Sequence, residues 1–379
     1  MTHHTSAPAP AGAAFRSPGR TSSRRGFLTS AGLGALGLTA LAACGSEASD
    51  AGAPAASAAA ASSVAAGAYG SLSLQLSWVK NIEFAGEYFA DSKGYYTEAG
   101  FEKVDLVTGP VDSADTLVSS GAIDVGLSAP DATARLITEQ GADLVIIGAT
   151  FQKNPFCILS IEEGKPIATV ADLAGKTIGI QAGTNQSIFE GFCKANDVDT
   201  STFKTTVVQY EPTPLTEKKV DGFMAYLTNE PFLVQQDGLT PVTLSFAENG
   251  LPLASETFVV TRTALGEDRE KFKAFLKAEI KGWNDAVADP EGGAKLAVET
   301  YGKDLGLKQA GQLEQLEAQN KLVVSADTKA NGLFTLTDEL ISGIIDALAA
   351  LEITITAEEL FDMSLLSEIY AAEPDLIKG

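Results

Sequence analysis

Aromatic, amide and acidic side chains follow the expected strands of this chain, at positions where the ends of parallel strands would meet. We expect a binding site built from Trp78, Asn81, Glu83, Phe84, Tyr88, Ser128, Gln152, Thr184, Asn185, Glu211, Tyr226, Asn229 and Glu230. Trp78 and Tyr226 offer ring faces on which a flat ligand can stack. Asn229 and Glu230 offer the donor and the acceptors that an exocyclic amine and a ring nitrogen require. This set predicts a site for a neutral or weakly basic nitrogen heterocycle.

Anion binding is the alternative chemistry for the same positions. A nitrate or sulfonate needs arginine, lysine or free backbone N–H groups at a helix start. The set contains no arginine, Lys80 and Lys153 are the nearby cations, and Gly183-Thr184-Asn185 is the clearest helix start. The sequence therefore favours the heterocycle and leaves the anion as an alternative.

Each candidate also has a purely structural interpretation. The aromatic candidates could instead pack in the core: Trp78, Phe84, Tyr88 and Tyr226. Polar candidates at expected helix starts could instead be caps: Thr184, Asn185, Asn229 and Glu230. The acids Glu83 and Glu211 could simply be solvated.

The positions of histidine limit the chemistry further. Both histidines, His3 and His4, lie in an N-terminal segment that we expect to be removed. The remaining chain would lack histidine acid–base catalysis, Ser-His-Asp or Cys-His nucleophiles, and histidine metal sites. We therefore predict no catalytic residue, no metal and no cofactor, and we do not expect an enzyme.

The segment from Ser23 to Cys44 has the order of an export signal. Arg24 and Arg25 precede an uncharged apolar stretch, and small residues stand directly before Cys44. The paired arginines are similar to a twin-arginine signal, and Leu41-Ala42-Ala43-Cys44 is similar to a bacterial lipobox. We expect residues 1–43 to be removed, Cys44 to be lipidated, and the protein to be anchored outside the cell membrane.

The composition beyond the leader predicts a tether and an acidic surface. Residues 44–69 are mostly alanine, serine and glycine and predict a flexible tether. The chain has 27 Lys and Arg against 49 Asp and Glu, and losing the four leader arginines leaves 23 against 49, a charge of −26. Such a surface disfavours nucleic acid as a partner.

Two cysteines remain besides Cys44. Cys157 and Cys193 match no zinc or C-x-x-C spacing. They could pair outside the cell, but we favour two small buried hydrophobic residues.

From Ser71 onward, strand-like segments alternate with helical ones. The expected strands are 71–77, 104–109, 123–128, 144–150, 156–161, the end of 172–180, 205–210, 221–226, 243–246 and 256–262. The expected helices are 84–93, 112–119, one from Pro130, 184–196, one after Pro214, 231–236, 268–288, 292–301, 308–320 and 337–351. This alternation predicts an α/β fold with parallel sheets covered by helices on both faces.

The order of these elements predicts two lobes. Residues 70–156 with 256–379 would form lobe one and its C-terminal helices, and residues 157–255 would form lobe two. Two crossings between lobes make a hinge that can close over a ligand. The ligand site of an open α/β sheet lies beyond the carboxyl ends of its strands, which here is the cleft between the lobes.

Three segments carry a resemblance to a known family: LSWVKNIEFAGEYFADSKGYYTEAGF (76–101), DLAGKTIGI (172–180) and VDGFMAYLTNEPFLVQQDG (220–238). They resemble the extracytoplasmic solute-binding proteins for thiamine pyrimidine precursors and for nitrate, sulfonate and taurine. The resemblance covers about residues 72–350. It implies a type II periplasmic-binding fold, a small-molecule ligand held between the lobes, and delivery by a monomer to an ABC permease and its ATPase.

The resemblance leaves several hypotheses. The first is a binding lipoprotein for a thiamine pyrimidine precursor, with riboflavin as the second ligand, and an anion-binding version is the third. A related thiamine-pyrimidine synthase consumes its own histidine, and this chain departs from its pattern: Met224-Ala225-Tyr226-Leu227-Thr228 stands where that enzyme is cysteine-rich. A lipoprotein that senses its ligand and signals to a membrane receptor is the last alternative.

Overall fold

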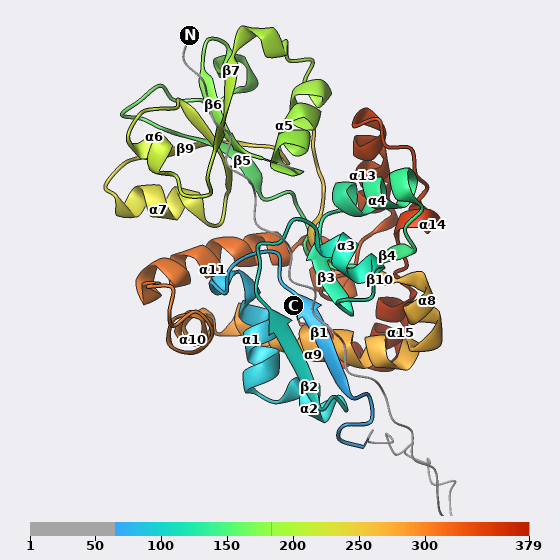
Figure 1. Ribbon diagram of the computed structural model, residues 1–379. Helices are drawn as coiled ribbons and strands as arrows, with labels where there is room; N and C mark the ends of the chain where they lie inside the picture. Colours follow the sequence, from blue (N-terminus) through green and yellow to red (C-terminus); the bar gives the residue numbers. More distant parts are fainter. Residues whose placement is uncertain (1–64, 183, 379) are drawn as a thin grey trace, which may run out of the picture. The chain divides into compact units, whose positions relative to one another are not determined.

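The computed structural model describes residues 65–182 and 184–378, and its framework is two five-stranded sheets (Figure 1). The predicted export signal, Cys44 and nearly all of the predicted tether lie outside the described residues. Within the described part, no helix combines the length and the apolar character needed to cross a membrane.

The first sheet has the strand order β2-β1-β3-β10-β4. Its strands are β1 (Ser71–Gln75), β2 (Lys103–Val107), β3 (Val125–Ser128), β4 (Leu144–Phe151) and β10 (Ser255–Thr261). β1 runs parallel to β2 and β3, whereas β10 runs antiparallel to β3 and β4.

The second sheet has the order β7-β6-β8-β5-β9. Its strands are β5 (Phe156–Ile161), β6 (Thr177–Gln181), β7 (Lys204–Val208), β8 (Gly222–Tyr226) and β9 (Pro241–Ser245). β6 runs parallel to β7 and β8, whereas β5 runs antiparallel to β8 and β9.

Both sheets are therefore mixed, and the prediction of parallel sheets was wrong at β5 and β10. These are the strands by which the chain passes from one sheet to the other. A parallel neighbour requires a crossover connection of about a dozen residues or more. A strand that arrives from the other sheet has no such crossover behind it, so its direction is free to reverse.

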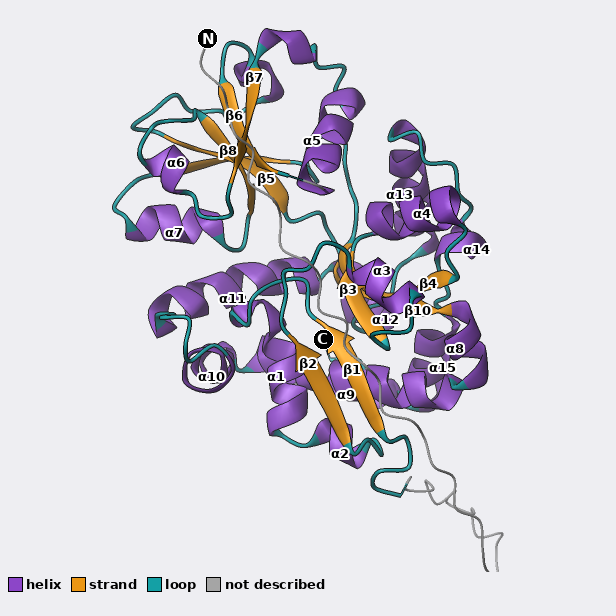
Figure 2. Cartoon of the chain, viewed as in Figure 1, coloured by secondary structure: helices purple, strands orange, loops and turns teal. Residues whose placement is uncertain are grey.

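Helices cover the sheets (Figure 2). The longer ones are α1 (Ala85–Ser92), α4 (Pro130–Gln140), α5 (Thr184–Ala195), α9 (Arg269–Ala288), α11 (Gln309–Val323), α13 (Asp338–Ala350) and α15 (Ser364–Ala372). The shorter ones are α2 (Tyr95–Glu98), α3 (Ala114–Ser119), α6 (Thr213–Thr216), α7 (Glu230–Gln236), α8 (Arg262–Glu267), α10 (Pro290–Leu296), α12 (Ala326–Asn331) and α14 (Ala357–Leu360).

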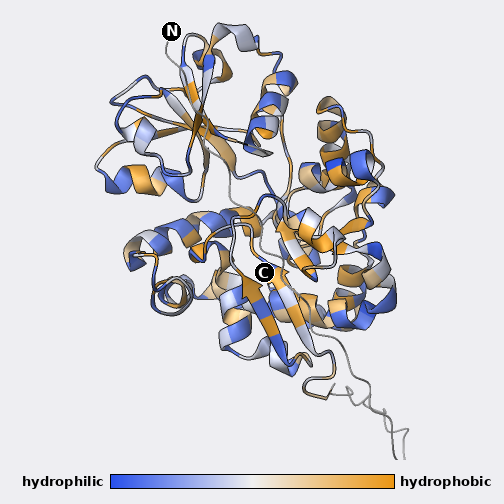
Figure 3. Ribbon diagram, in the orientation of Figure 1, coloured by the Kyte–Doolittle hydropathy of each residue, from blue (hydrophilic) through white to orange (hydrophobic). Residues whose placement is uncertain are grey.

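The apolar faces of these helices account for the core. Side chains of α1 and α9 pack with those of β1, β3, β4 and β10 in one cluster. α5 packs on one face of the second sheet, while α6 and α7 pack on the other. β5, buried along its whole length, is coloured almost entirely hydrophobic (Figure 3). This full burial explains the unbroken apolar run at 156–161, because both of its faces carry helices.

Some helices of the structure differ from the sequence predictions or were not predicted. The segment 292–301 is the end of α10 followed by the π-helical turn η4 (Ala297–Tyr301), not one regular helix. α2, α8, α12, α14 and α15 were not predicted. Four to nine residues give few turns from which a helical period can be read, although the equally short α3, α6 and α7 were predicted.

Two further expectations concern cysteines and lobes. Cys157 and Cys193 are both buried and unpaired, as favoured from their spacing. The strands of the second sheet all lie between Phe156 and Ser245. The lobe boundaries themselves stay a prediction.

Candidate ligand-binding site

Three buried glutamates from three separate segments form the centre of the candidate site. Glu83 lies in the 3₁₀ turn η1 (Ile82–Phe84), Glu230 begins α7, and Glu256 lies near the start of β10. Their exposed fractions are 7%, 7% and 3%. We call these three residues the acid triad. Acidic side chains are seldom buried this far without a partner, so the triad requires a physical account.

Glu256 is held in place by a serine of the first sheet. The Ser77 hydroxyl lies 2.9 Å from Oε1 and 2.8 Å from Oε2 of Glu256, so it donates to this carboxyl. The backbone of Glu256 has φ of 50°, a left-handed conformation that a non-glycine residue rarely adopts. Burial raises the pKa of Glu256 to about 7, although the hydrogen bonds from Ser77 and Glu83 oppose the rise.

Glu230 is positioned by its own helix start. Its carboxyl accepts hydrogen bonds from the backbone N–H of Tyr226 at 2.8 Å and from Nδ2 of Asn229 at 3.2 Å. An acid suits this place because the first turn of a helix carries unpaired N–H groups. Burial nevertheless raises the pKa of Glu230 to about 7.

Glu83 connects the other two acids. Burial, followed by the negative charges of Glu256 and Glu230, raises the pKa of Glu83 well above its ordinary value. Its carboxyl is within hydrogen-bond reach of that of Glu256. Two carboxyl groups can share a hydrogen bond only while one of them is protonated.

No cation balances the acid triad within the described part of the chain. None of the ion pairs formed by residues 65–182 and 184–378 involves Glu83, Glu230 or Glu256. Such an arrangement offers several acceptors and repels anions. It therefore suits a ligand rich in N–H groups or carrying positive charge.

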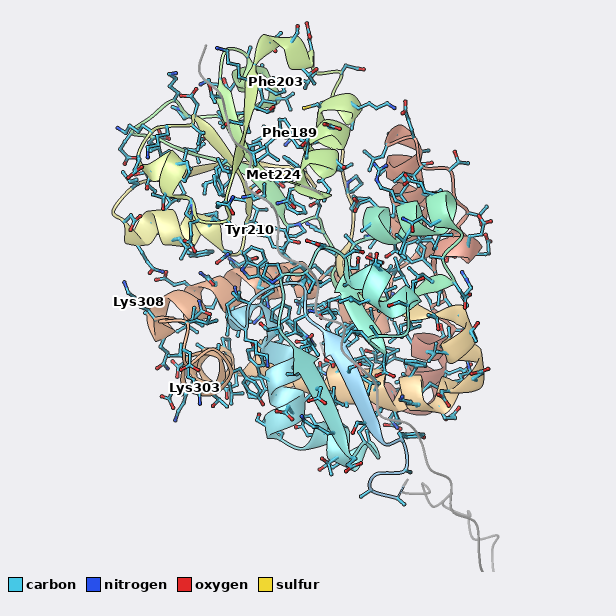
Figure 4. The ribbon with its side chains drawn as sticks, in the orientation of Figure 1. Phe189, Phe203, Tyr210, Met224, Lys303 and Lys308 are labelled. Atoms are coloured by element: carbon cyan, nitrogen blue, oxygen red, sulfur yellow. The ribbon has the colours of Figure 1, made fainter. Side chains whose placement is uncertain are left out.

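Two aromatic pairs accompany the acids. Trp78 and Tyr210 meet edge to face with ring centroids 4.6 Å apart, which brings the end of β1 against the residues after β7. Tyr210, labelled in Figure 4, is 42% exposed. Tyr226 and Phe156 form a second edge-to-face pair at 4.6 Å. Burial, then the charges of Glu256 and Glu83, raises the pKa of the Tyr226 hydroxyl well above its usual range. A half-exposed tyrosine against tryptophan provides a surface on which a flat molecule can pack.

Phe84 and Tyr88 occupy the core instead. Phe84 is 1% exposed and belongs to the cluster under the first sheet. Tyr88 is fully buried, stacks on Tyr301 at 4.2 Å, and donates from its hydroxyl to the carbonyl of Asn81 at 2.8 Å. Their spacing of four residues reflects packing, so neither enters the proposed ligand contacts.

The amide candidates serve mainly local structure. Asn81 caps η1, because its Oδ1 accepts from the backbone N–H of Glu83 at 2.9 Å. This cap fixes the turn that holds Glu83. Asn185 of α5 donates to Oε1 of Gln181, the last residue of β6, at 2.9 Å. Thr184 is the first residue of the same helix.

The remaining candidates are Ser128, Gln152 and Glu211, and they differ in burial and in hydrogen bonding. Ser128 donates to the buried Asp115, beside Thr133. Gln152 is 4% exposed; its Nε2 donates to the carbonyl of Ala149 at 3.1 Å, whereas its Oε1 is buried without a partner. Glu211 is exposed and contributes to the raised pKa of Glu230.

Sequence reasoning left out some members of this arrangement. Glu256, Ser77, Tyr210 and Phe156 were not among the predicted site residues. Ser77 and Tyr210 lie two residues after β1 and β7, whereas Phe156 and Glu256 lie at the starts of β5 and β10. Position at a strand terminus is the signal that could have selected them. Among the described residues, no cluster of three or more His, Cys, Asp or Glu side chains could hold a metal ion.

Comparison with known proteins places the chain in a family. The model of the family described as "NMT1/THI5 like" matches residues 81–293, more than half of the chain. The riboflavin-binding protein RibY of Chloroflexus aurantiacus is 26% identical over 227 residues. That match covers 58% of this chain and spans 63% of the relative's length.

Solved structures agree on the fold. The aliphatic sulphonate binding protein SsuA of Escherichia coli superposes with a TM-score of 0.53 at 18% identity, covering 78% of this chain and 91% of that one. The nitrate-binding protein NrtA of Synechocystis PCC 6803 gives 0.58 at 13% identity, covering 82% and 91%. The fold is that of the periplasmic binding proteins, and the chain belongs to the NMT1/THI5-like family.

Proposed function

We propose that this protein is an extracytoplasmic solute-binding protein of an ABC importer and that the acid triad and its flanking aromatic side chains receive the solute. The family and the fold support a binding role. The proposal takes the cleft between the two predicted lobes as the site. It names an ABC permease and its ATPase as partners, and it assigns no catalytic step to the chain.

The observation that carries the choice of ligand is the acid triad beside Trp78, Tyr210 and Tyr226, with no cation paired to it in the described residues. Carboxylates accept hydrogen bonds from ring N–H and exocyclic amine groups, and aromatic rings pack on a flat heterocycle. A thiamine pyrimidine precursor has both features and is the first candidate. Riboflavin is the second, and the relatedness to a riboflavin-binding protein favours keeping it.

Nitrate, sulfonate and taurine rank lower. Proteins named for sulphonate and nitrate share the fold at 18% and 13% identity, which speaks for the fold and not for the ligand. An anion entering beside three carboxyl groups would meet repulsion unless the carboxyls were protonated.

The test is a binding titration of the purified protein with hydroxymethylpyrimidine, riboflavin, taurine and nitrate. We expect binding of a heterocycle and no binding of the anions. Glu230→Gln should weaken heterocycle binding by roughly 30-fold, because a hydrogen bond to a charged group is lost. Glu162→Gln, an exposed residue after β5, is the matched control and should leave the affinity unchanged. Binding of taurine or nitrate alone would overturn the choice of ligand.

Anchoring by a lipid on Cys44 is part of the proposal. It rests on the order of the leader residues, which lie outside the described structure. Replacing Cys44 with Ala removes the thiol that would carry the lipid, so the variant should leave the membrane fraction. Fractionation of cells producing each form gives the answer, and retention of the variant in membranes would contradict a lipid anchor.

A sensing role is the second candidate function. It uses the same capture step, followed by contact with a membrane receptor in place of a permease. Uptake of labelled ligand by cells with and without the protein separates the two roles.

A further inference from the structure

We propose that the site takes its ligand as a cation, namely a flat heterocycle that carries an exocyclic amine and holds a proton on a ring nitrogen. The inference rests on the proposed function, since it specifies the ligand class of the same site. It separates an aminopyrimidine from heterocycles of similar shape that stay neutral.

The acid triad carries negative charge that no cation of the described residues balances. Glu83 and Glu256 are 7% and 3% exposed and lie within hydrogen-bond reach of each other. The Ser77 hydroxyl donates to Glu256, while the described residues provide no donor to the Glu83 carboxyl other than the neighbouring acid. Ionising two neighbouring buried carboxyls together is costly without a compensating positive charge.

The second step comes from the groups that surround this pair. Glu87 of α1, Glu230 of α7 and Tyr226 of β8 all interact electrostatically with one or both of its members. These three groups are acids or a phenol, so each adds negative charge or none. These neighbours therefore favour a cation beside Glu83 and Glu256.

An independent observation lies on β4, beside Glu256. Ser255 pairs with Phe151 and Thr257 with Ala149, so Glu256 lies opposite Thr150. Thr150 belongs to β4, and Gln152 directly follows the last residue of that strand. Oγ1 of Thr150 and Oε1 of Gln152 are both buried and have no partner. Buried polar atoms are nearly always hydrogen-bonded. These two oxygens are therefore available to accept further N–H groups of the same ligand.

The charge state of the ligand determines the proton balance. The proposal assigns one shared proton to Glu83 and Glu256 in the free protein. A ligand that arrives already protonated displaces this proton to solvent. A neutral ligand with a basic ring nitrogen receives the proton from the pair, and no proton is exchanged with solvent. A neutral ligand without a basic nitrogen leaves the proton where it is and gains no ion pair.

Two probes of matched shape test the proposal: hydroxymethylpyrimidine, which has a basic amino-substituted ring, and its pyrimidinone analogue, in which an oxygen replaces the amine. Titration calorimetry of the full chain near pH 7 should show the aminopyrimidine binding roughly 30-fold tighter or more, the discrimination expected for a hydrogen-bonded charge. Repeating the titration in buffers of different ionisation enthalpy measures the protons exchanged.

Glu256→Gln and Glu83→Gln should each reduce the preference to a few-fold, because either change removes an acid from the pair. Glu162→Gln should keep the full preference, and either triad variant suffices if the other fails to fold. Equal affinity for the two probes, or a preference that survives both triad variants, would overturn the proposal while leaving heterocycle binding intact. Failure of both probes and of riboflavin to bind would instead remove the heterocycle as the ligand of the proposed function, and the inference with it.

Discussion

The structure has two groups of buried acidic side chains, and the residues that surround them differ. The acid triad joins residues from η1, α7 and β10. A second group, which we call the inner cluster, consists of Glu87, Tyr96, Glu279 and Trp283, between α1, α2 and α9. Glu87 and Glu279 are fully buried, and Tyr96 donates to Glu279 at 2.5 Å. Burial raises the pKa of Glu279 to about 8 and that of Glu87 well above its ordinary value.

Burial and raised pKa values therefore do not distinguish the two groups of acids. The residues that pack around each group do distinguish them. The inner cluster lies where the backbones of α1 and α9 approach closely at Gly86 and Gly282. Next to the acid triad, Trp78 directly follows Ser77, which donates to Glu256, and Trp78 packs on Tyr210, which is 42% exposed. Tyr210 therefore provides a solvent-exposed ring close to the acid triad in the chain, since it directly precedes Glu211, whose charge acts on Glu230. Perturbed acids mark candidate sites only when solvent-accessible aromatic or polar groups adjoin them.

The largest expected effect on stability comes from forcing apart the backbones of α1 and α9 beside the inner cluster. A Cβ added at Gly282 would lie 2.1 Å from the carbonyl oxygen of Gly86 and 2.8 Å from the backbone N of Ala90. Backbone atoms cannot move aside cheaply, so Gly282→Ala should lower the free energy of unfolding by about 3 kcal/mol. Denaturant unfolding followed by circular dichroism measures this change.

Gly343→Ala in α13 is the matched control, because nothing lies within 4 Å of its added Cβ. It should stabilise the protein by up to about 1 kcal/mol, since alanine is the better helix former. Equal midpoints for the two variants would mean that α1 and α9 do not approach as closely as described.

The fold was largely predictable because its signals are local. The apolar run 156–161 is β5 from end to end, and Pro130 begins α4 as its residue type suggested. Strand direction was not predictable at β5 and β10. It depends on which sheet the chain enters next, and no residue type along those strands records that choice.

The site was predictable only where chemistry and local structure coincide. Asn229-Glu230 before a proline indicated both a helix start and a pair of polar groups, and the structure has Glu230 there with Tyr226 and Asn229 as donors. Glu256 was missed because its importance comes from Ser77, 179 residues earlier in the chain. Phe84 and Tyr88 carried the right residue types but point into the core, which their sequence could not distinguish from a site.

A smaller effect is expected from the pH dependence of stability. Glu279 has a pKa of about 8 in the folded protein, raised by burial, against about 4.3 in an unfolded chain. A raised folded pKa stabilises the protein fully below the unfolded value, and this stabilisation is lost as the pH rises through 8. Unfolding free energy should therefore fall between pH 5 and pH 9, and Glu279→Gln should remove the part of that fall that comes from this carboxyl.

The control for this measurement is Glu270→Gln, an exposed position on the same helix α9. It should show the same pH profile as the unaltered protein. An unchanged profile in Glu279→Gln would assign the pH dependence to other acids, with the acid triad as the next group to vary.

The smallest expected effect is on ligand affinity, and it concerns the exposed aromatic pair of Trp78 and Tyr210. Tyr210 packs edge to face on Trp78, and such pairs contribute about 1 kcal/mol. If this pair forms one wall of the ligand site, Tyr210→Ala should weaken heterocycle binding about fivefold, whereas Tyr210→Phe should keep nearly full affinity because the ring remains. Val207→Ala, 67% exposed on the neighbouring β7, removes apolar surface without touching Trp78 and should bind normally. Calorimetric titration of the three variants decides the matter. Normal affinity in Tyr210→Ala would mean that Tyr210 does not contact the ligand. The aromatic side chains that distinguish the acid triad from the inner cluster would then be Tyr226 and Phe156.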